Sequence, residues 1–345
     1  MEATHVFTYD SVDDEDQAAR ELNRRLHALG VEAPFVLRSV HGKRLAQDLN
    51  GPTAAEIHVA KANQQWAADL GSRARRAGAD AIVAIGGGRC LDVAKLAAAR
   101  AGLTVVAVPT QLSHDGICSP VAVVPNDGPA ESLGAIAPRA VFLSIPTLMH
   151  APVASVRAGL GDLLANPLAL RDWALAASRG LEETDQRAWD LSVESFELIT
   201  DHLDVDPGVS AREPLFLRRL ADALILSGMA MIYAGSSRPA SGGEHEISHA
   251  IDELHGGRAL HGAQVAFGCI FSVCLYGEDT DAFRRRLSHL GLPEHPKDLG
   301  LTKEDVVRIV LAAPETRPGR FTIVEDADLD EGRAGALVER IWGES

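Results

Sequence analysis

The strongest constraint on the fold of this chain is an alternation of short strand-like and helix-like segments over its first 150 residues. Five β-prone runs stand out, namely Phe35-Val36-Leu37, Ile57-His58-Val59, Ala81 to Ile85, Thr104 to Val108 and Val141-Phe142-Leu143. Between them apolar residues recur at helical spacing, as Leu22, Leu26 and Leu29 do before Gly30. Apolar strands that alternate with amphipathic helices indicate a parallel sheet covered by helices on both faces.

The remainder of the chain has a different pattern, which predicts helices. Segments rich in Ala and Leu, separated by Gly and Pro, span residues 168–179, 191–202, 214–234, 265–276, 303–312 and 335–342. A chain of 345 residues exceeds the size at which one hydrophobic core usually stops growing. We therefore expect an α/β domain over residues 1–150 and an all-helical domain over residues 151–345.

Charge and composition exclude several classes of partner. The formal net charge is −15, and a field of that sign repels phosphate backbones and anionic lipid, so neither nucleic acid nor a membrane is expected. No apolar run approaches the roughly 20 residues that span a bilayer, and the N-terminus lacks a signal-peptide pattern. The four cysteines have no C-x-x-C spacing. The expected location is therefore a reducing cytoplasm.

A glycine turn follows one of the strand-like runs. Residues 80–85 lead directly into Gly86-Gly87-Gly88, and a helical segment follows. Glycines let the backbone approach a pyrophosphate, and the N–H groups that open a helix favour its negative charge. A bound dinucleotide is one prediction; a tight turn without ligand is the other, because Leu91 breaks the G-x-G-x-x-G fingerprint. Asp92 and Lys95 are accordingly either cofactor residues or solvated helix residues.

Residues 245–249 spell H-E-x-x-H, a pattern that zinc proteases use. The spacing places His245 and His249 on one helical face. The metzincin pattern, however, has Gly where this chain has Asp252, and all four methionines precede the motif, so that no Met-turn can follow it. We therefore do not expect a protease.

Several motifs follow one another along the chain. They are Gly86-Gly87-Gly88 with Asp92 to Lys95; Val108-Pro109-Thr110 leading to Ser113-His114-Asp115-Gly116; Ala158 to Leu164 with Asp172-Trp173; Ser241 to His245 through His249; His261-Gly262; and Ala313-Pro314 through Arg317 to Thr322. This set resembles the superfamily of iron-containing alcohol dehydrogenase, glycerol dehydrogenase and dehydroquinate synthase. Ser-His-Asp-Gly resembles its sn-glycerol-1-phosphate dehydrogenase branch. The resemblance implies a dehydroquinate synthase-like fold, with a Rossmann-like domain before a helical one.

The resemblance also implies a metal site. The family holds its metal with one carboxylate and two histidines, which correspond here to Asp162, His249 and His261. Such a site with open coordination positions suits Zn²⁺ as a Lewis acid, with Ni²⁺ and Fe²⁺ as alternatives. Taken singly, each residue is better explained without a metal, Asp162 as a helix cap, His261 as a cap or loop histidine and His249 as a buried core histidine. His245 is expected to support the metal ligands or to face the substrate as a catalytic residue, and His255 to lie at the surface.

Further residues are assigned to the cofactor and substrate by the same resemblance. The cofactor residues are Gly86, Gly87, Gly88, Asp92, Lys95, Thr110 and Ser113. Asp115 is expected to contact the substrate and relay a proton, or alternatively to be a turn residue. Arg38 and other basic residues after the run Phe35-Val36-Leu37 favour NADPH over NADH, because basic groups accept the 2′-phosphate; a solvated basic loop is the ordinary alternative.

The activity implied is a metal-dependent reduction of a small ketone with NAD(P)H, namely dihydroxyacetone phosphate to sn-glycerol 1-phosphate. A polyol or phosphonate dehydrogenase would keep the same motifs. So would a sugar-phosphate cyclase of the dehydroquinate synthase type, which uses NAD without net redox change. The remaining alternative is a nucleotide-binding protein that has lost its activity. The expected partner is a small phosphorylated molecule, whose phosphate is assigned to no residue, and the chain is expected to form a homo-oligomer.

Overall fold

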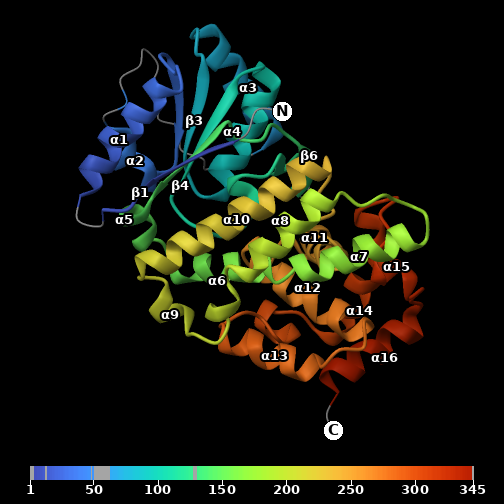
Figure 1. Ribbon diagram of the computed structural model, residues 1–345. Coiled ribbons are helices and arrows are strands. Elements are labelled where there is room, and N and C mark those ends of the chain that lie inside the picture. Colours follow the sequence, from blue (N-terminus) through green and yellow to red (C-terminus); the bar gives the residue numbers. More distant parts are fainter. Residues whose placement is uncertain (1–3, 12–13, 48, 50–62, 127–129, 344–345) are drawn as a thin grey trace. The chain divides into compact units, whose positions relative to one another are not determined.

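The computed structural model describes residues 4–11, 14–47, 49, 63–126 and 130–343 (Figure 1). The chain divides into two compact units. The first combines Met1–Pro152 with Ser210–Gly228, and the second combines Val153–Val209 with Met229–Ser345. The segment 210–228, which the sequence pattern assigned to the helical domain, thus groups with the α/β part.

A five-stranded parallel sheet forms the centre of the first unit. Its order is β1-β7-β4-β3-β2, and every neighbouring pair is parallel. The strands are β1 (His5–Tyr9), β2 (Pro34–Arg38), β3 (Ala81–Gly86), β4 (Thr104–Pro109) and β7 (Ala140–Ser144). Four of the β-prone runs are confirmed as strands, and the run 57–59 lies outside the described residues. The predicted α/β class is confirmed.

Three strands were not expected from the sequence. β1 pairs with β7, Val6 opposite Val141, at the edge of the sheet, where its residues are exposed or half-buried. β5 (Val121–Pro125) and β6 (Ala130–Gly134) form a separate antiparallel hairpin. β1 and β6 contain few apolar residues, and β5 alternates buried with half-buried residues, because an edge strand and a two-stranded ribbon need not bury both faces.

Helices cover both faces of the sheet, as expected. They are α1 (Glu15–Ala28), α2 (Lys43–Ala46), α3 (Gln64–Arg76), α4 (Gly88–Ala101) and, after β7, α5 (Ile145–Met149). Alternate strand residues such as Val83 and Ile85 share one core with Leu22 and Leu26 of α1, because successive strand residues point to opposite faces. α3 packs on α4, and α4 lies against β3 and β4. In Figure 1 α1 and α2 lie on one side of the sheet and α3 and α4 on the other.

The second unit is helical, as predicted, and no strand occurs in its described part, residues 153–208 and 229–343. Its helices are α6 (Val153–Leu163), α7 (Asn166–Ser178), α8 (Gln186–Glu197), α11 (Gly243–His255), α12 (His261–Leu275), α13 (Thr280–His289), α14 (Lys303–Ala312), α15 (Ile323–Asp326) and α16 (Glu331–Trp342). The short α9 (Pro207–Ser210) and the long α10 (Pro214–Ala234) contribute residues to both units.

Helix α12 lies in the core of the second unit. Almost all of its residues are buried, from Gly262 to Cys274. Phe267 stacks on Trp342 of α16 with ring centroids 5.6 Å apart, and Phe271 meets the same indole edge-on at 5.5 Å. A helix that is apolar all round is buried on every side. The packing of α12 therefore fixes the position of its first residue, His261.

Within the described residues, no helix is long and apolar enough to cross a membrane. All four cysteines are buried and free.

Candidate active site

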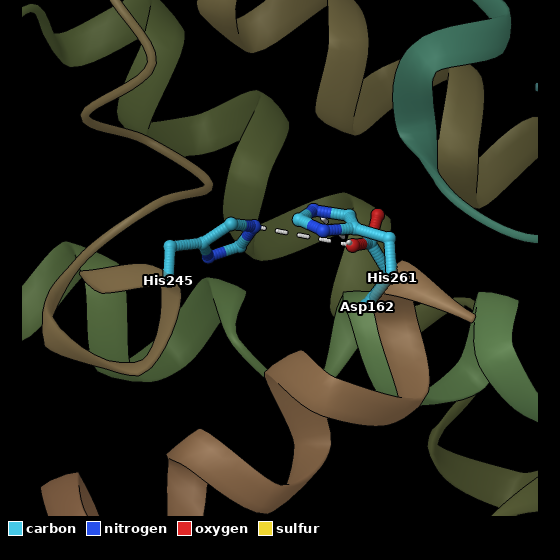
Figure 2. A group of neighbouring side chains, drawn as sticks. All are labelled: Asp162, His245 and His261. Carbon is cyan, nitrogen blue, oxygen red and sulfur yellow. Dashed lines mark ion pairs between the residues drawn. The ribbon is translucent and has the colours of Figure 1, made fainter. Parts of the chain in front are cut away.

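A carboxylate and two imidazoles meet in the second unit. Asp162 stands near the end of α6, His245 in the first turn of α11, and His261 at the start of α12. Figure 2 shows their side chains facing one another. Oδ1 of Asp162 lies 3.8 Å from Nε2 of His261 and 4.0 Å from Nε2 of His245, and one ligand atom from each residue lies within 4.8 Å of the others. This donor set suits Zn²⁺ or a similar divalent ion.

Glycines bring α6 and α12 together beside this cluster. A Cβ atom on Gly161 would overlap the carbonyl oxygen of Gly262, and a Cβ on Gly262 would overlap the carbonyl oxygen of Ala158. The two backbones therefore touch, which only glycine permits. Asp162 follows one of these glycines and His261 precedes the other, so the close approach brings both side chains to the same place.

A third glycine brings α11 against α12. A Cβ on Gly268 would overlap the carbonyl oxygen of Glu244, the residue before His245. The carboxylate of Glu244 lies 2.9 Å from Nδ1 of His245. A carboxylate at one ring nitrogen fixes the orientation of the other. Nε2 of His245 is thereby directed to the cluster, and burial raises the pKa of Glu244 to about 7.

His249, the expected metal ligand, has a different neighbour. It lies one turn after His245 on α11, and its Nε2 is 2.9 Å from Nη2 of Arg317. Burial and the positive charge of Arg317 hold its pKa well below the usual range, so the ring is neutral and accepts the guanidinium proton. The group of three thus differs from the expected set at one member, because His245 stands where His249 was expected.

In the first unit, the carboxyl ends of β2, β3 and β4 meet at one edge of the sheet. Arg38 pairs in register with Ile85, and Gly86 with Pro109. The amide of Thr110 donates to the carbonyl oxygen of Gly86 at 3.0 Å. The structure therefore brings together Arg38, Gly86 and Thr110, three of the residues expected to bind the cofactor. They lie at the edge where open α/β sheets bind ligands.

The glycine turn also accommodates side chains of the chain itself. A Cβ on Gly87 would lie 2.5 Å from the side-chain amide of Gln111, and a Cβ on Gly88 would overlap the ring of His114. Both side chains come from the segment after β4. The turn leaves the first N–H groups of α4 without a capping side chain, because its N-cap is Gly87. Such a helix start suits an anion.

Asp92 and Lys95 are buried on α4, so the interpretation of both as solvated helix residues is wrong. Nζ of Lys95 lies 2.9 Å from Oδ1 of Asp92 and donates to the carbonyl oxygens of Gly116, at 2.8 Å, and of Val121. Oδ2 of Asp92 accepts from the amide of Val123 at 3.3 Å. These contacts hold the segment that contains Asp115, and a direct contact of either residue with the cofactor stays a prediction.

Ser113 is buried, and Asp115 opens the short 3₁₀ turn Asp115–Ile117. The hydroxyl of Ser227 donates to Oδ2 of Asp115 at 2.9 Å. Burial raises the pKa of Asp115 to about 6, although this hydrogen bond and the charge of Lys95 act in the opposite direction. A carboxyl that changes charge near neutral pH is suited to proton transfer. Ser227 was missed from the sequence, since nothing local connects it to Asp115.

Residues 14–152 match a family model described as iron-containing alcohol dehydrogenase. A glycerol-1-phosphate dehydrogenase (NAD(P)+) of Cenarchaeum symbiosum is 40% identical over 261 residues, 76% of this chain and 72% of the relative. That of Methanocorpusculum labreanum is 35% identical over 322 residues, 92% of this chain and 88% of the relative.

Solved structures share the fold. A probable glycerol dehydrogenase from Sinorhizobium meliloti 1021 superposes with a TM-score of 0.79 at 21% identity, covering 98% of this chain and 96% of the other. A 1,3-propanediol oxidoreductase superposes with a TM-score of 0.75 at 16% identity, covering 98% of each chain. At these identities the likeness concerns the fold, and it agrees with the fold that the sequence motifs implied.

Proposed function

Because the chain belongs to the glycerol-1-phosphate dehydrogenase family, related to the iron-containing alcohol dehydrogenases, we propose that it reduces dihydroxyacetone phosphate to sn-glycerol 1-phosphate. As a member of this family it is an NAD(P)-dependent alcohol dehydrogenase with a small-molecule substrate. The observation that carries the proposal is the cluster of Asp162, His245 and His261. We further expect a cytoplasmic homo-oligomer.

Asp162, His245 and His261 hold the metal ion in this proposal, which replaces the earlier assignment of His249. Their ligand atoms lie within 4.8 Å of one another, and a carboxylate with two imidazoles is a donor set for Zn²⁺, with Ni²⁺ and Fe²⁺ as alternatives. When bound, the ion supplies Lewis-acid polarisation of the ketone oxygen, and the reduced nicotinamide supplies the hydride. His249 takes the role first given to His245 and faces the substrate, because its ring lies 6.2 Å from that of His261.

Asp115 handles the proton in this proposal. Reduction of a ketone places negative charge on its oxygen, which must receive a proton. The carboxyl of Asp115, with a pKa of about 6 and a hydrogen bond from Ser227, can hold that proton and release it near neutral pH.

The edge of the parallel sheet binds the nicotinamide cofactor. The turn Gly86–Gly88 and the start of α4 receive its pyrophosphate, while Thr110 and Ser113 line the same edge. Arg38, at the end of β2, favours NADPH over NADH because a guanidinium pairs with a 2′-phosphate.

The test is oxidation of NADPH and of NADH by the zinc-loaded protein with dihydroxyacetone phosphate. Stoichiometric loss of the reduced-nicotinamide absorbance is the expected result, and it also excludes a cyclase that uses NAD without net redox change. Zinc content and turnover are also measured in the variants Asp162→Ala, His245→Ala and His249→Ala. The first two variants should lose both metal and turnover, and His249→Ala should keep the metal. Loss of zinc from His249→Ala with retention in His245→Ala would refute the ligand assignment.

A further inference from the structure

We propose that Arg317 and Arg320, together with the hydroxyl of Ser237, form the site that binds the phosphate of the substrate. This inference rests on the proposed function, because it assigns the phosphorylated end of the same ketone. Arg317 and Arg320 lie in the motif that follows Ala313-Pro314, to which the sequence pattern assigned no role, and Ser237 lies outside every motif.

The two guanidinium groups converge on one oxygen atom. Nη1 of Arg317 donates to Oγ of Ser237 at 2.9 Å, and Nη2 of Arg320 donates to the same Oγ at 3.0 Å. A turn produces this arrangement, since the amide of Arg320 donates to the carbonyl oxygen of Arg317 at 3.0 Å and Gly319 has φ +85°. A left-handed glycine of this kind lets two side chains three positions apart point the same way.

Among the described residues, the two arginines of this pair make no direct salt bridge, although the charges of Glu246 and Glu244 act on Arg317, and the charge of Glu246 acts on Arg320. The neighbouring Arg238, in contrast, is paired with Glu182 through Nε and Oε2 at 2.7 Å. Burial lowers the pKa of both Arg317 and Arg320, and their mutual repulsion adds to this for Arg320, which falls to about 10. Two half-buried cations side by side are stabilised by an anion between them.

The chain offers further donors at the same place. Arg320 also donates to the backbone carbonyl of Ser241, whose own hydroxyl is buried and has no hydrogen-bond partner. Guanidinium forks match the oxygens of a phosphate bidentately, and hydroxyl groups supplement them. A phosphomonoester, which carries three terminal oxygens, uses this set more fully than a carboxylate does.

The proposed phosphate site lies close to the cluster of Asp162, His245 and His261, with the ring of His249 between the two. Arg317 donates to Nε2 of His249 at 2.9 Å, and the ring of His249 lies 6.2 Å from that of His261. A ligand that reaches both places needs an oxygen for the metal and an anionic group a few bonds away. A small ketone phosphorylated next to its carbonyl group has this form. The pair also reverses locally the field of a chain whose net charge is −15.

The test compares a phosphorylated ketone with its neutral counterpart. The ratio of kcat/KM for dihydroxyacetone phosphate to kcat/KM for dihydroxyacetone is measured in wild type, Arg317→Ala and Arg320→Ala. We expect the ratio to fall roughly 10- to 100-fold in each variant, mainly through KM, because each removes a charge-assisted hydrogen bond. Arg285→Ala, which removes an exposed arginine of α13, is the matched control and should keep the wild-type ratio.

A second measurement does not depend on turnover. Binding of inorganic phosphate to the zinc-loaded protein is followed by calorimetry, and it should weaken in both variants but not in Arg285→Ala. Arg317→Lys and Arg320→Lys keep the charge and should give intermediate values, which separates loss of binding from misfolding. An unchanged ratio with unchanged phosphate binding would overturn the inference. If the wild type reduces neither ketone, the proposed function fails, whereas phosphate binding that depends on both arginines still supports the proposed phosphate site.

Discussion

The hydroxyl of Ser227 donates a 2.9 Å hydrogen bond to Oδ2 of Asp115, although the two residues are 112 positions apart in the sequence. Both belong to the first unit, where α10 brings Ser227 beside the turn that Asp115 opens. Burial raises the pKa of Asp115 to about 6, and the hydrogen bond opposes that rise. The pair therefore sets the pH at which this carboxyl becomes charged.

Removing the hydroxyl should move this pH upward. In the proposed mechanism, Asp115 must be ionised to take the proton of the alcohol when glycerol 1-phosphate is oxidised, so kcat/KM should rise with pH through about 6. In Ser227→Ala the rise should occur at a higher pH, because the hydrogen bond that favours the charged form is gone. The check is the pH profile of NADP+ reduction, with Ser288→Ala, an exposed serine of α13, as the control. Coincident profiles for the two variants would remove Asp115 from the proton transfer.

The contact of Gly262 with α6 should control metal binding. In Gly262→Ala the new Cβ would overlap the carbonyl oxygen of Ala158, so the helices must separate and His261 must move away from Asp162. We expect a free energy of unfolding lower by about 1–3 kcal/mol and zinc affinity reduced at least about tenfold. Urea denaturation and zinc titration measure these quantities.

Gly335→Ala is the matched control, because nothing lies within 4 Å of a Cβ at that position in α16. It should leave zinc affinity unchanged and stabilise the protein by about 0.5–1 kcal/mol, since alanine favours a helix over glycine. Equal zinc affinity in the two variants would contradict the role of the glycine contact.

The buried pair of Lys95 and Asp92 should be essential for stability. Lys95 is 1% exposed, and in Lys95→Met the carboxylate of Asp92 would be left buried without its cation. The expected loss is about 3–5 kcal/mol in the free energy of unfolding. Lys95→Met combined with Asp92→Leu should lose less than the sum of the two single variants, because the pair is coupled. Strictly additive effects in urea denaturation would argue against the pair.

Asp172 should make stability depend on pH. It accepts hydrogen bonds from Tyr276 Oη at 2.6 Å and from the amide of Gly243 at 2.8 Å, yet burial and the charge of Glu244 raise its pKa from 3.8 to about 7. The folded state then keeps a proton that the unfolded chain releases. This contribution to stability is complete below pH 4 and is lost as pH rises toward about 7, at up to about 1.4 kcal/mol per pH unit.

Tyr276→Phe removes one hydrogen bond to the charged form of Asp172, so the loss should continue to higher pH. Urea unfolding across pH 5 to 9 measures this. Tyr233→Phe is the control, since Tyr233 packs against the cluster of Leu170, Trp173 and Ala188 and its hydroxyl forms no hydrogen bond among the described residues. The same pH dependence in both variants would contradict the role of Tyr276.

Local patterns in the sequence were enough for the overall architecture. Ala81 to Ile85 and Thr104 to Val108 predicted buried parallel strands because side chains on both faces of such a strand must be apolar. The same reasoning failed for β1, since an edge strand such as His5–Tyr9 needs few apolar residues. The resemblance of the motifs to the family also indicated Asp162 and His261, which the structure brings together.

The sequence by itself determined the fold class, because periodicity and glycine placement are local properties, and the family resemblance of its motifs indicated a cluster of one carboxylate and two histidines. Tertiary structure decided which histidine joins the cluster. His245 and His249 are four positions apart and share one helical face, so spacing does not distinguish them. The contact of Gly268 with Glu244 and the hydrogen bond of Arg317 to His249 do distinguish them. The convergence of Arg317 and Arg320 on Ser237, 80 and 83 positions away, likewise exists only in the folded chain, since distant side chains meet through packing.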